Sequence, residues 1–107
     1  MRYVGMFHPA PSNMVRPSEE RMAAMGELIQ TMKSKGALLV TEPLGSPGTG
    51  ARIELADGQY QVVELTDRPG GYAILQADTR EACIEQIKEF LAVAGDGVCE
   101  IRQIVEM

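Results

Sequence analysis

Apolar residues gather along the chain in short runs that predict the strands of a sheet. The runs at residues 3–8, 37–40 and 72–75 are apolar at both alternating positions, which is typical of strands that are covered on both faces. Residues 99–105 are expected to form the last strand. The pattern therefore predicts a small sheet whose central strands are apolar on both sides.

A hairpin is expected between the second and third of these runs. Residues 52–55 alternate apolar and polar side chains, residues 60–65 form another strand run, and Asp57 and Gly58 lie between them. An Asp-Gly pair favours a tight turn, because both central positions of that turn need positive φ. Residues 45–50 contain three glycines and a proline, so this segment is expected to be a loop without regular structure.

Two helices are predicted from apolar stripes at spacings of three and four. Ser18 is the expected N-cap of the first helix, and Gly36 is expected to end it. Asp78 is the expected start of the second helix, with Glu81 placed as in a capping box, and Gly95 is the expected end. The stripes consist of Met22, Met25, Leu28, Ile29 and Met32 in the first helix and of Cys83, Ile84, Ile87, Phe90, Leu91 and Ala94 in the second.

The order strand, helix, strand, hairpin, strand, helix, strand predicts one α+β domain over residues 1–107. Two right-handed crossovers would place both helices on one face of a mainly antiparallel sheet, which is the ferredoxin-like arrangement with an inserted hairpin. The other face would then expose apolar side chains that the chain itself does not cover. A second copy is the simplest cover, so we expect a homodimer of two stacked sheets.

The net charge of −5 on 107 residues excludes some classes of partner. An acidic protein repels phosphate backbones and anionic lipid surfaces, so neither nucleic acid nor a membrane is expected as a partner. No run of about 18 apolar residues is present to span a bilayer, and the start of the chain lacks the zones of a signal peptide. A cytoplasmic location is therefore expected.

The sulfur-containing residues are expected to be structural. Cys83 and Cys99 are too few and too far apart to predict a disulfide scaffold, and the single histidine cannot complete a zinc site with them. The methionine stripe of the first helix is typical of core packing, because a copper site needs closer and convergent sulfur atoms. We expect neither a metal nor a cofactor.

Several segments resemble YCII-related proteins of the DGPF type. Residues 70–76 (GGYAILQ), 80–82 (REA) and 90–103 (FLAVAGDGVCEIRQ) resemble the C-terminal half of that family. The resemblance extends backwards to nearly the whole chain through residues 17–26, 35–39 and 50–52. It implies a bacterial protein with the dimeric α/β-barrel form of the ferredoxin-like fold. It implies little about chemistry, because most members of the family have no established activity.

Two further properties of this family bear on function. Some YCII-like relatives are enzymes thought to use a histidine and an aspartate, and DGPF-type members often accompany alternative sigma factors. Residues 64–70 (ELTDRPG) are shorter than the family's segment and lack Asp-Gly-Pro-Phe, which leaves Asp67 as the candidate for its aspartate. The first helix has methionine or other non-titrating residues where YCII-like enzymes place histidine. The resemblance therefore carries over no complete dyad.

His8 and Asp67 are the candidate catalytic residues. His8 is the only side chain whose ordinary pKa lies near neutrality, and a strand end that opens on a cleft suits a general base. Asp67 could orient His8 or relay its proton. The alternatives are a partly exposed loop histidine and a turn aspartate that bonds to its own backbone.

Tyr72, Arg102 and Glu100 are the candidate ligand-binding residues on the strands. The guanidinium of Arg102 could form two parallel hydrogen bonds with a ligand carboxylate. Glu100 and Arg102 lie two residues apart on one face of a strand, so the alternative is an ion pair between strands or at the rim of a dimer.

These residues lead to three hypotheses about function. The first is a small-molecule-binding homodimer with a cleft beside His8, Asp67 and Tyr72 in each subunit. The second is a cofactor-free lyase or isomerase in which His8 moves a proton on a cyclic or phenolic substrate. The third is a protein-interaction module linked to transcription control. Replacing His8 by alanine separates the first two, because ligand binding persists in the first and turnover is lost in the second.

Overall fold

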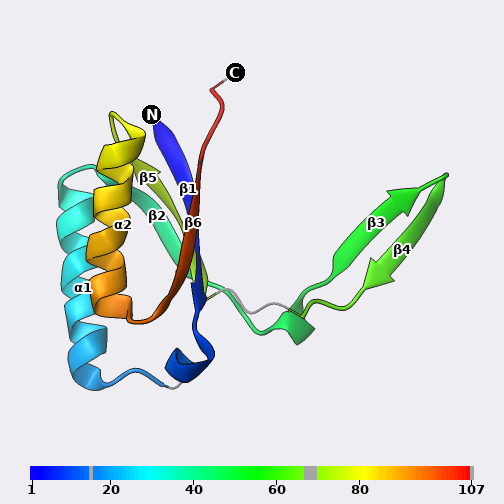
Figure 1. Ribbon diagram of the computed structural model, residues 1–107, viewed down its shortest axis with the longest axis horizontal. Coiled ribbons are helices and arrows are strands. Elements are labelled where there is room, and N and C mark those ends of the chain that lie inside the picture. The colour runs from blue at the N-terminus through cyan, green and yellow to red at the C-terminus, as the bar shows by residue number, and fades with distance from the viewer. Residues whose placement is uncertain (15, 67–69, 107) are drawn as a thin grey trace.

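The computed structural model describes residues 1–14, 16–66 and 70–106, and it shows a four-stranded sheet, two α-helices and a projecting hairpin (Figure 1). The sheet order is β2-β5-β1-β6, and every neighbouring pair is antiparallel. Both helices lie on one face of the sheet (Figure 1). The predicted ferredoxin-like α+β fold is confirmed. In chain order the elements are β1 (Arg2–Pro9), α1 (Glu19–Ser34), β2 (Leu38–Pro43), β3 (Arg52–Ala56), β4 (Gln59–Val63), β5 (Gly71–Gln76), α2 (Arg80–Ala94) and β6 (Gly97–Gln103).

Helix α1 begins and ends where the sequence predicts. The Ser18 hydroxyl accepts a hydrogen bond from the Arg21 backbone N–H at 3.1 Å, and Gly36 has φ +74° just after the last turn. The apolar stripe is fully buried only near its C-terminal end, at Met32, whereas Leu28 and Ile29 are half-buried and Met22 is 44% exposed. The first turns of α1 therefore extend beyond the core.

Helix α2 has a different N-cap from the one predicted. The Thr79 hydroxyl, not Asp78, accepts the capping hydrogen bond from the Ala82 backbone N–H at 3.1 Å. Thr79 has the extended backbone that an N-cap needs, so the helix begins one residue later than the capping-box pattern indicates. The predicted end is confirmed, since Gly95 has φ +92° and its N–H donates to the Leu91 carbonyl.

The strands differ from their predicted bounds by a few residues. The second run forms β2 and ends at Pro43, as expected, with a bulge between Leu38 and Val40 that leaves Leu39 45% exposed. The last strand is shifted two residues toward the N-terminus. The hairpin turn is confirmed, because Asp57 and Gly58 have φ of +52° and +77°. The loop at residues 45–50 was predicted to be irregular but contains a short 3-10 turn at Pro47–Thr49.

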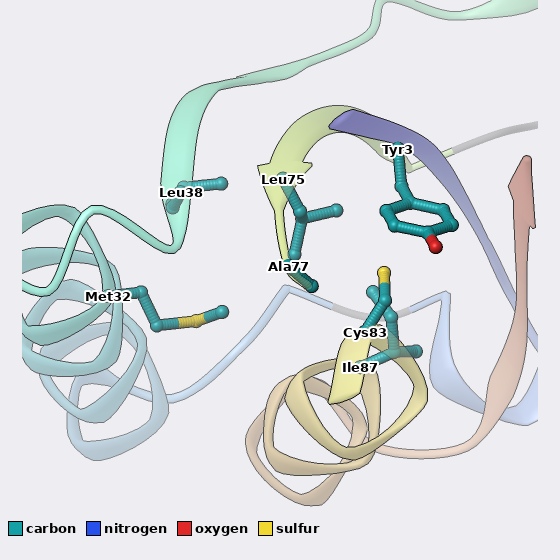
Figure 2. Packing of buried hydrophobic residues seen from close by; sticks show 7 residues of the cluster. All are labelled: Tyr3, Met32, Leu38, Leu75, Ala77, Cys83 and Ile87. Atoms are coloured by element: carbon teal, nitrogen blue, oxygen red, sulfur yellow. The ribbon is translucent and has the colours of Figure 1, made fainter. Parts of the chain in front are cut away.

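The core lies between the sheet and the helices, on what we name the closed face. Figure 2 shows buried side chains from the strands pointing toward Met32 of α1 and toward Cys83 and Ile87 of α2. Leu75 is 2% exposed and Cys83 is fully buried, so these two are the best covered side chains of the cluster. The cluster consists of Tyr3, Met32, Leu38, Leu75, Ala77, Cys83 and Ile87.

The opposite side of the sheet, which we name the open face, has no cover from the described residues (Figure 1). Directly paired residues of neighbouring strands point to the same side, so the register assigns each row to one face. Met6 is 37% exposed and Val98 is 60% exposed on this side. The open face consists of Val4, Met6, His8, Val40, Glu42, Tyr72, Ile74, Gln76, Val98, Glu100 and Arg102.

The β3–β4 hairpin, residues 52–63, extends away from the rest of the chain, and we name it the arm (Figure 1). All ten of its strand residues are exposed. The radius of gyration is 15.8 Å, whereas a compact chain of this length has about 13 Å. The arm therefore contributes no side chains to the core. Within the described ranges, no helix is long and apolar enough to cross a membrane.

Candidate functional site

A cavity of about 360 Å³ lies between the closed face of the sheet and the two helices. Its walls come from β1, β2 and β5 on one side and from α1 and α2 on the other. Met25 and Ile29 of the α1 stripe border it, and so do Ile87 and Phe90 of α2. The two helical stripes predicted from the sequence therefore form one wall of a cavity as well as part of the core.

Phe7 forms part of the cavity wall in a fixed position. Its ring meets the ring of Phe90 edge to face, with 5.3 Å between centroids and 83° between planes. A Cβ atom on Gly97 would lie 2.6 Å from Cε1 of Phe7, so only glycine fits beside the ring at that position. A Cβ on Gly70 would lie 3.1 Å from the other side of the ring. Two aromatic rings thus present flat apolar surface to whatever enters the cavity.

Polar groups border the cavity at the β2 edge of the sheet, where Thr41, Glu42 and Tyr72 lie. The Thr41 hydroxyl donates to the Tyr72 carbonyl at 3.0 Å. The Tyr72 hydroxyl donates to Oε2 of Glu42 at 3.1 Å, and this bond, helped by partial desolvation, raises the pKa of Tyr72 above its ordinary value. The register places the side chains of Glu42 and Tyr72 on the open face, so this bond lies on the other side of the sheet from the cavity, whereas the Thr41 side chain lies on the closed face.

The two thiols are close to the cavity but poorly reactive. Cys99 borders the cavity, and Cys83 is buried in the core beneath it. Both are free cysteines. Burial raises the pKa of each thiol, and the neighbouring Cys83 raises the pKa of Cys99 further. At neutral pH the two side chains therefore act as small apolar groups.

The predicted ligand-binding and catalytic residues gather on the open face, except Asp67, which lies outside the described residues. His8 does not border the cavity; its Nε2 lies 3.8 Å from Oε1 of Glu100 on the same face. Glu100 is therefore placed against His8, while Arg102 lies one row further along β6, paired with Val4. Tyr72 is the one predicted residue that also borders the cavity.

A single row of the register connects these groups across the open face. Glu42, Tyr72, Met6 and Glu100 are paired in that order on β2, β5, β1 and β6. The Tyr72–Glu42 bond joins β5 to β2, and the His8–Glu100 pair joins β1 to β6, so the two lie in opposite halves of the sheet. The open face therefore has an apolar centre at Met6 with an acidic side chain at each end of the row.

No protein-family model matches the chain, and no curated protein matches it. Among solved structures it is similar to 5-chloro-2-hydroxyhydroquinone dehydrochlorinase from Burkholderia phenoliruptrix, in a complex with 2,5-dihydroxybenzoquinone. The TM-score is 0.64 at 18% identity, over 100% of this chain and 96% of that chain. The two chains share the ferredoxin-like α+β fold. This likeness shows the fold and leaves the function to the residues.

One group of contacts in the structure has no counterpart in the sequence predictions. The Asn13 amide donates to the carbonyls of Ala94 and Asp96 at 2.9 and 3.0 Å, and Nη1 of Arg21 donates to Oδ1 of Asn13 at 2.9 Å. These bonds join the loop after β1 and the first turns of α1 to the C-terminal end of α2. Partners 81 and 83 residues apart leave no local signal in the sequence.

Proposed function

We propose that the protein binds a small, flat and mostly apolar ring compound in the cavity of the closed face. The observation that carries this proposal is the cavity itself, whose volume of about 360 Å³ falls in the range of small-molecule sites. Phe7 and Phe90 supply flat surfaces, and Met25 and Met32 supply flexible side chains that adapt to ligand shape.

The polar groups at the β2 edge favour a ligand that carries hydroxyl groups. The Thr41 hydroxyl borders the cavity from the closed face, donates to the Tyr72 carbonyl and keeps lone pairs that can accept from a ligand hydroxyl. An anionic ligand would be disfavoured by the net charge of −5. A neutral phenol or hydroquinone fits these conditions, and the complex of the similar dehydrochlorinase with 2,5-dihydroxybenzoquinone supports a small, flat, hydroxylated ring as the ligand class, without supporting its neutral charge.

We also propose that the binding protein is a homodimer that stacks the open faces of two copies, as a bacterial, cytoplasmic member of the YCII-related family. The open face offers apolar surface that the described residues of one copy cover only in part, from Val4, Met6, Val40, Ile74 and Val98. The fold likeness and the family resemblance of the segments around β5, α2 and β6 support this assembly.

A second candidate function is proton transfer by His8, as in a cofactor-free lyase or isomerase. The approach of His8 to Glu100 at 3.8 Å favours it, because a carboxylate beside an imidazole can hold the ring in one orientation. In this function the substrate would lie on the open face, between stacked sheets. His8→Ala would then abolish turnover while ring compounds still bound to the closed-face cavity.

The test of cavity binding uses a matched pair of alanine-to-leucine variants. Ala73 borders the cavity, so Ala73→Leu should fill part of it, whereas Ala92 is exposed on α2 and Ala92→Leu should leave it unchanged. Titration calorimetry with 2,5-dihydroxybenzoquinone and with neutral hydroquinones is expected to show at least about tenfold weaker binding for Ala73→Leu only. Equal affinity of both variants, with unchanged circular dichroism, would refute the proposed cavity.

A second readout uses the thiol that borders the cavity. A bound neutral phenol should slow alkylation of Cys99, which lies at the cavity, by excess maleimide at neutral pH, where the ligand stays protonated and the small thiolate fraction still reacts. Mass spectrometry of peptides separates Cys99 from Cys83. If saturating ligand left the alkylation rate of Cys99 unchanged, the ligand would bind outside this cavity.

A further inference from the structure

The arm has one apolar face and one polar face. The register pairs Ile53 with Val62 and Leu55 with Tyr60, so these four side chains lie on the same side of the hairpin. Their exposed fractions are 68%, 73%, 61% and 75%. The other side carries Arg52, Glu54, Ala56, Gln59, Gln61 and Val63, and Nη2 of Arg52 lies 3.7 Å from Oε2 of Glu54.

A hairpin of this kind needs a surface to lie on. Two strands of five residues without further support are at most marginally stable in water, and a contiguous exposed apolar face on such a hairpin indicates an interaction site. No side chain of the arm's strands is buried by the described residues of the same chain. The cover of the apolar face must therefore come from another molecule.

The direction of the arm indicates which molecule this is. The arm leaves the sheet near the ends of β2 and β5 and extends on the side away from the helices, which is the side of the open face (Figure 1). A second copy stacked on the open face would lie beside the arm. The open face measures roughly 19 by 20 Å in projection. This area is about half of the 800 Å² that each partner of a stable dimer buries, and the uneven surface of the side chains makes up only part of the difference.

We propose that the β3–β4 arm is exchanged between two copies of the chain, so that each arm lays Ile53, Leu55, Tyr60 and Val62 against the body of its partner. The two contacts are equivalent in a two-fold dimer. The apolar face of the arm has no charged residue, and its one nearby cation, Arg52, lies on the other face against Glu54. A phosphate-rich or anionic lipid partner therefore finds no attractive charge there. The inference rests on the homodimer proposed above and adds a second contact to it.

A pair of tryptophan variants tests this arrangement. The chain has no tryptophan, so Tyr60→Trp places a single reporter on the apolar face and Gln61→Trp places one on the polar face of the same strand. In the exchanged dimer the emission of Tyr60→Trp should be blue-shifted, and it should move to the red on dilution through the dimer dissociation constant. The emission of Gln61→Trp should stay at the position of an exposed indole throughout.

Sedimentation of further variants measures how much the arm contributes to the affinity of the dimer. Ile53→Gln together with Val62→Gln removes apolar contacts from the arm and should weaken the dimer by at least about tenfold, while Glu54→Gln on the other face should not. The exchanged arm would be overturned if the double variant dimerised as tightly as the wild type and both tryptophan reporters emitted in the red. The stacked dimer would remain in that case.

Two other outcomes also overturn the exchanged arm. Blue-shifted emission of Tyr60→Trp in a sedimenting monomer would mean that the arm lies on its own body. A wild-type protein that stays monomeric at high micromolar concentration would remove both the arm exchange and the homodimer. Ligand binding by the closed-face cavity is measured separately, so that part of the proposed function is judged by its own titration.

Discussion

Leu75 and Ile74 are adjacent in β5, and they show how differently the two faces of the sheet are used. Leu75 points to the closed face and is 2% exposed, whereas Ile74 points to the open face and is only partly covered. The sequence makes both faces of β5 apolar. An apolar pattern therefore indicates that a side chain needs a cover, but not whether the cover belongs to the same molecule.

The largest expected effect comes from breaking the closed face. Leu75→Ala should lower the free energy of unfolding by about 2–5 kcal/mol, because it leaves a cavity in the centre of the core. Ile74→Ala is the matched control and should cost about 1 kcal/mol, since no helix packs on that side chain. Urea unfolding at a protein concentration below dimer formation measures both. Equal losses would mean that the open face is covered as fully as the core.

A smaller effect on folding but a large effect on assembly is expected at the centre of the open face. Met6→Asp places a carboxylate between Tyr72 and Glu100 in the cross-strand row, where a stacked partner would bury it. The dimer dissociation constant should rise by at least about hundredfold. Leu39→Asp, at the exposed bulge of β2, is the control and should leave assembly unchanged. Sedimentation velocity that shows equal assembly in both variants would contradict stacking through this face.

The smallest expected effect is a change of titration at the edge of the open face. Glu42→Gln removes the charged acceptor of the Tyr72 hydroxyl, so the raised pKa of Tyr72 should fall toward its ordinary value of about 10. In the wild type, the stabilising effect of this bond is complete below pH of about 10 and is lost as the pH rises through the higher pKa of the folded state. Ultraviolet titration of tyrosinate follows the change.

Two further variants make the titration specific. Tyr72→Phe identifies the contribution of Tyr72 among the three tyrosines of the chain. Glu100→Gln removes the carboxylate beside His8, two strands away, and should leave the titration of Tyr72 as it is. A Tyr72 titration that moves equally in the two glutamine variants would show a long-range charge effect in place of the hydrogen bond.

The parts of the fold that follow from neighbouring residues could be predicted from the sequence. The turn at Asp57 and Gly58, the cap at Ser18 and the end of α2 at Gly95 each depend on a few adjacent positions. The cap of α2 was misplaced because Asp78 and Thr79 are both good capping residues, and only the backbone angles select Thr79. The bulge in β2 depends on its pairing with β5 and has no local signal.

The cavity could not be predicted, because its walls come from both helices and several strands that meet only in the folded chain. Alternation along β1 would have separated His8 from the cavity, since Phe7 faces the helices and the next residue must face away. The same alternation in the arm groups Ile53 and Leu55 on one face and the polar residues on the other. Both groupings follow from the alternation of side-chain direction along a strand, which can be followed in the sequence.

The bulge at Leu39 also bears on what happens when the protein is concentrated. Growth of an endless β-ribbon requires each molecule to offer two free strand edges, one to accept a neighbour and one to extend. The edge strand β2 is interrupted between Leu38 and Val40 and finishes at Pro43, which has no N–H to donate. The other edge strand, β6, is paired without interruption. The irregular residue at Leu39 therefore disfavours edge-to-edge growth of the four-stranded sheet through β2 and leaves β6 as the regular edge of that sheet.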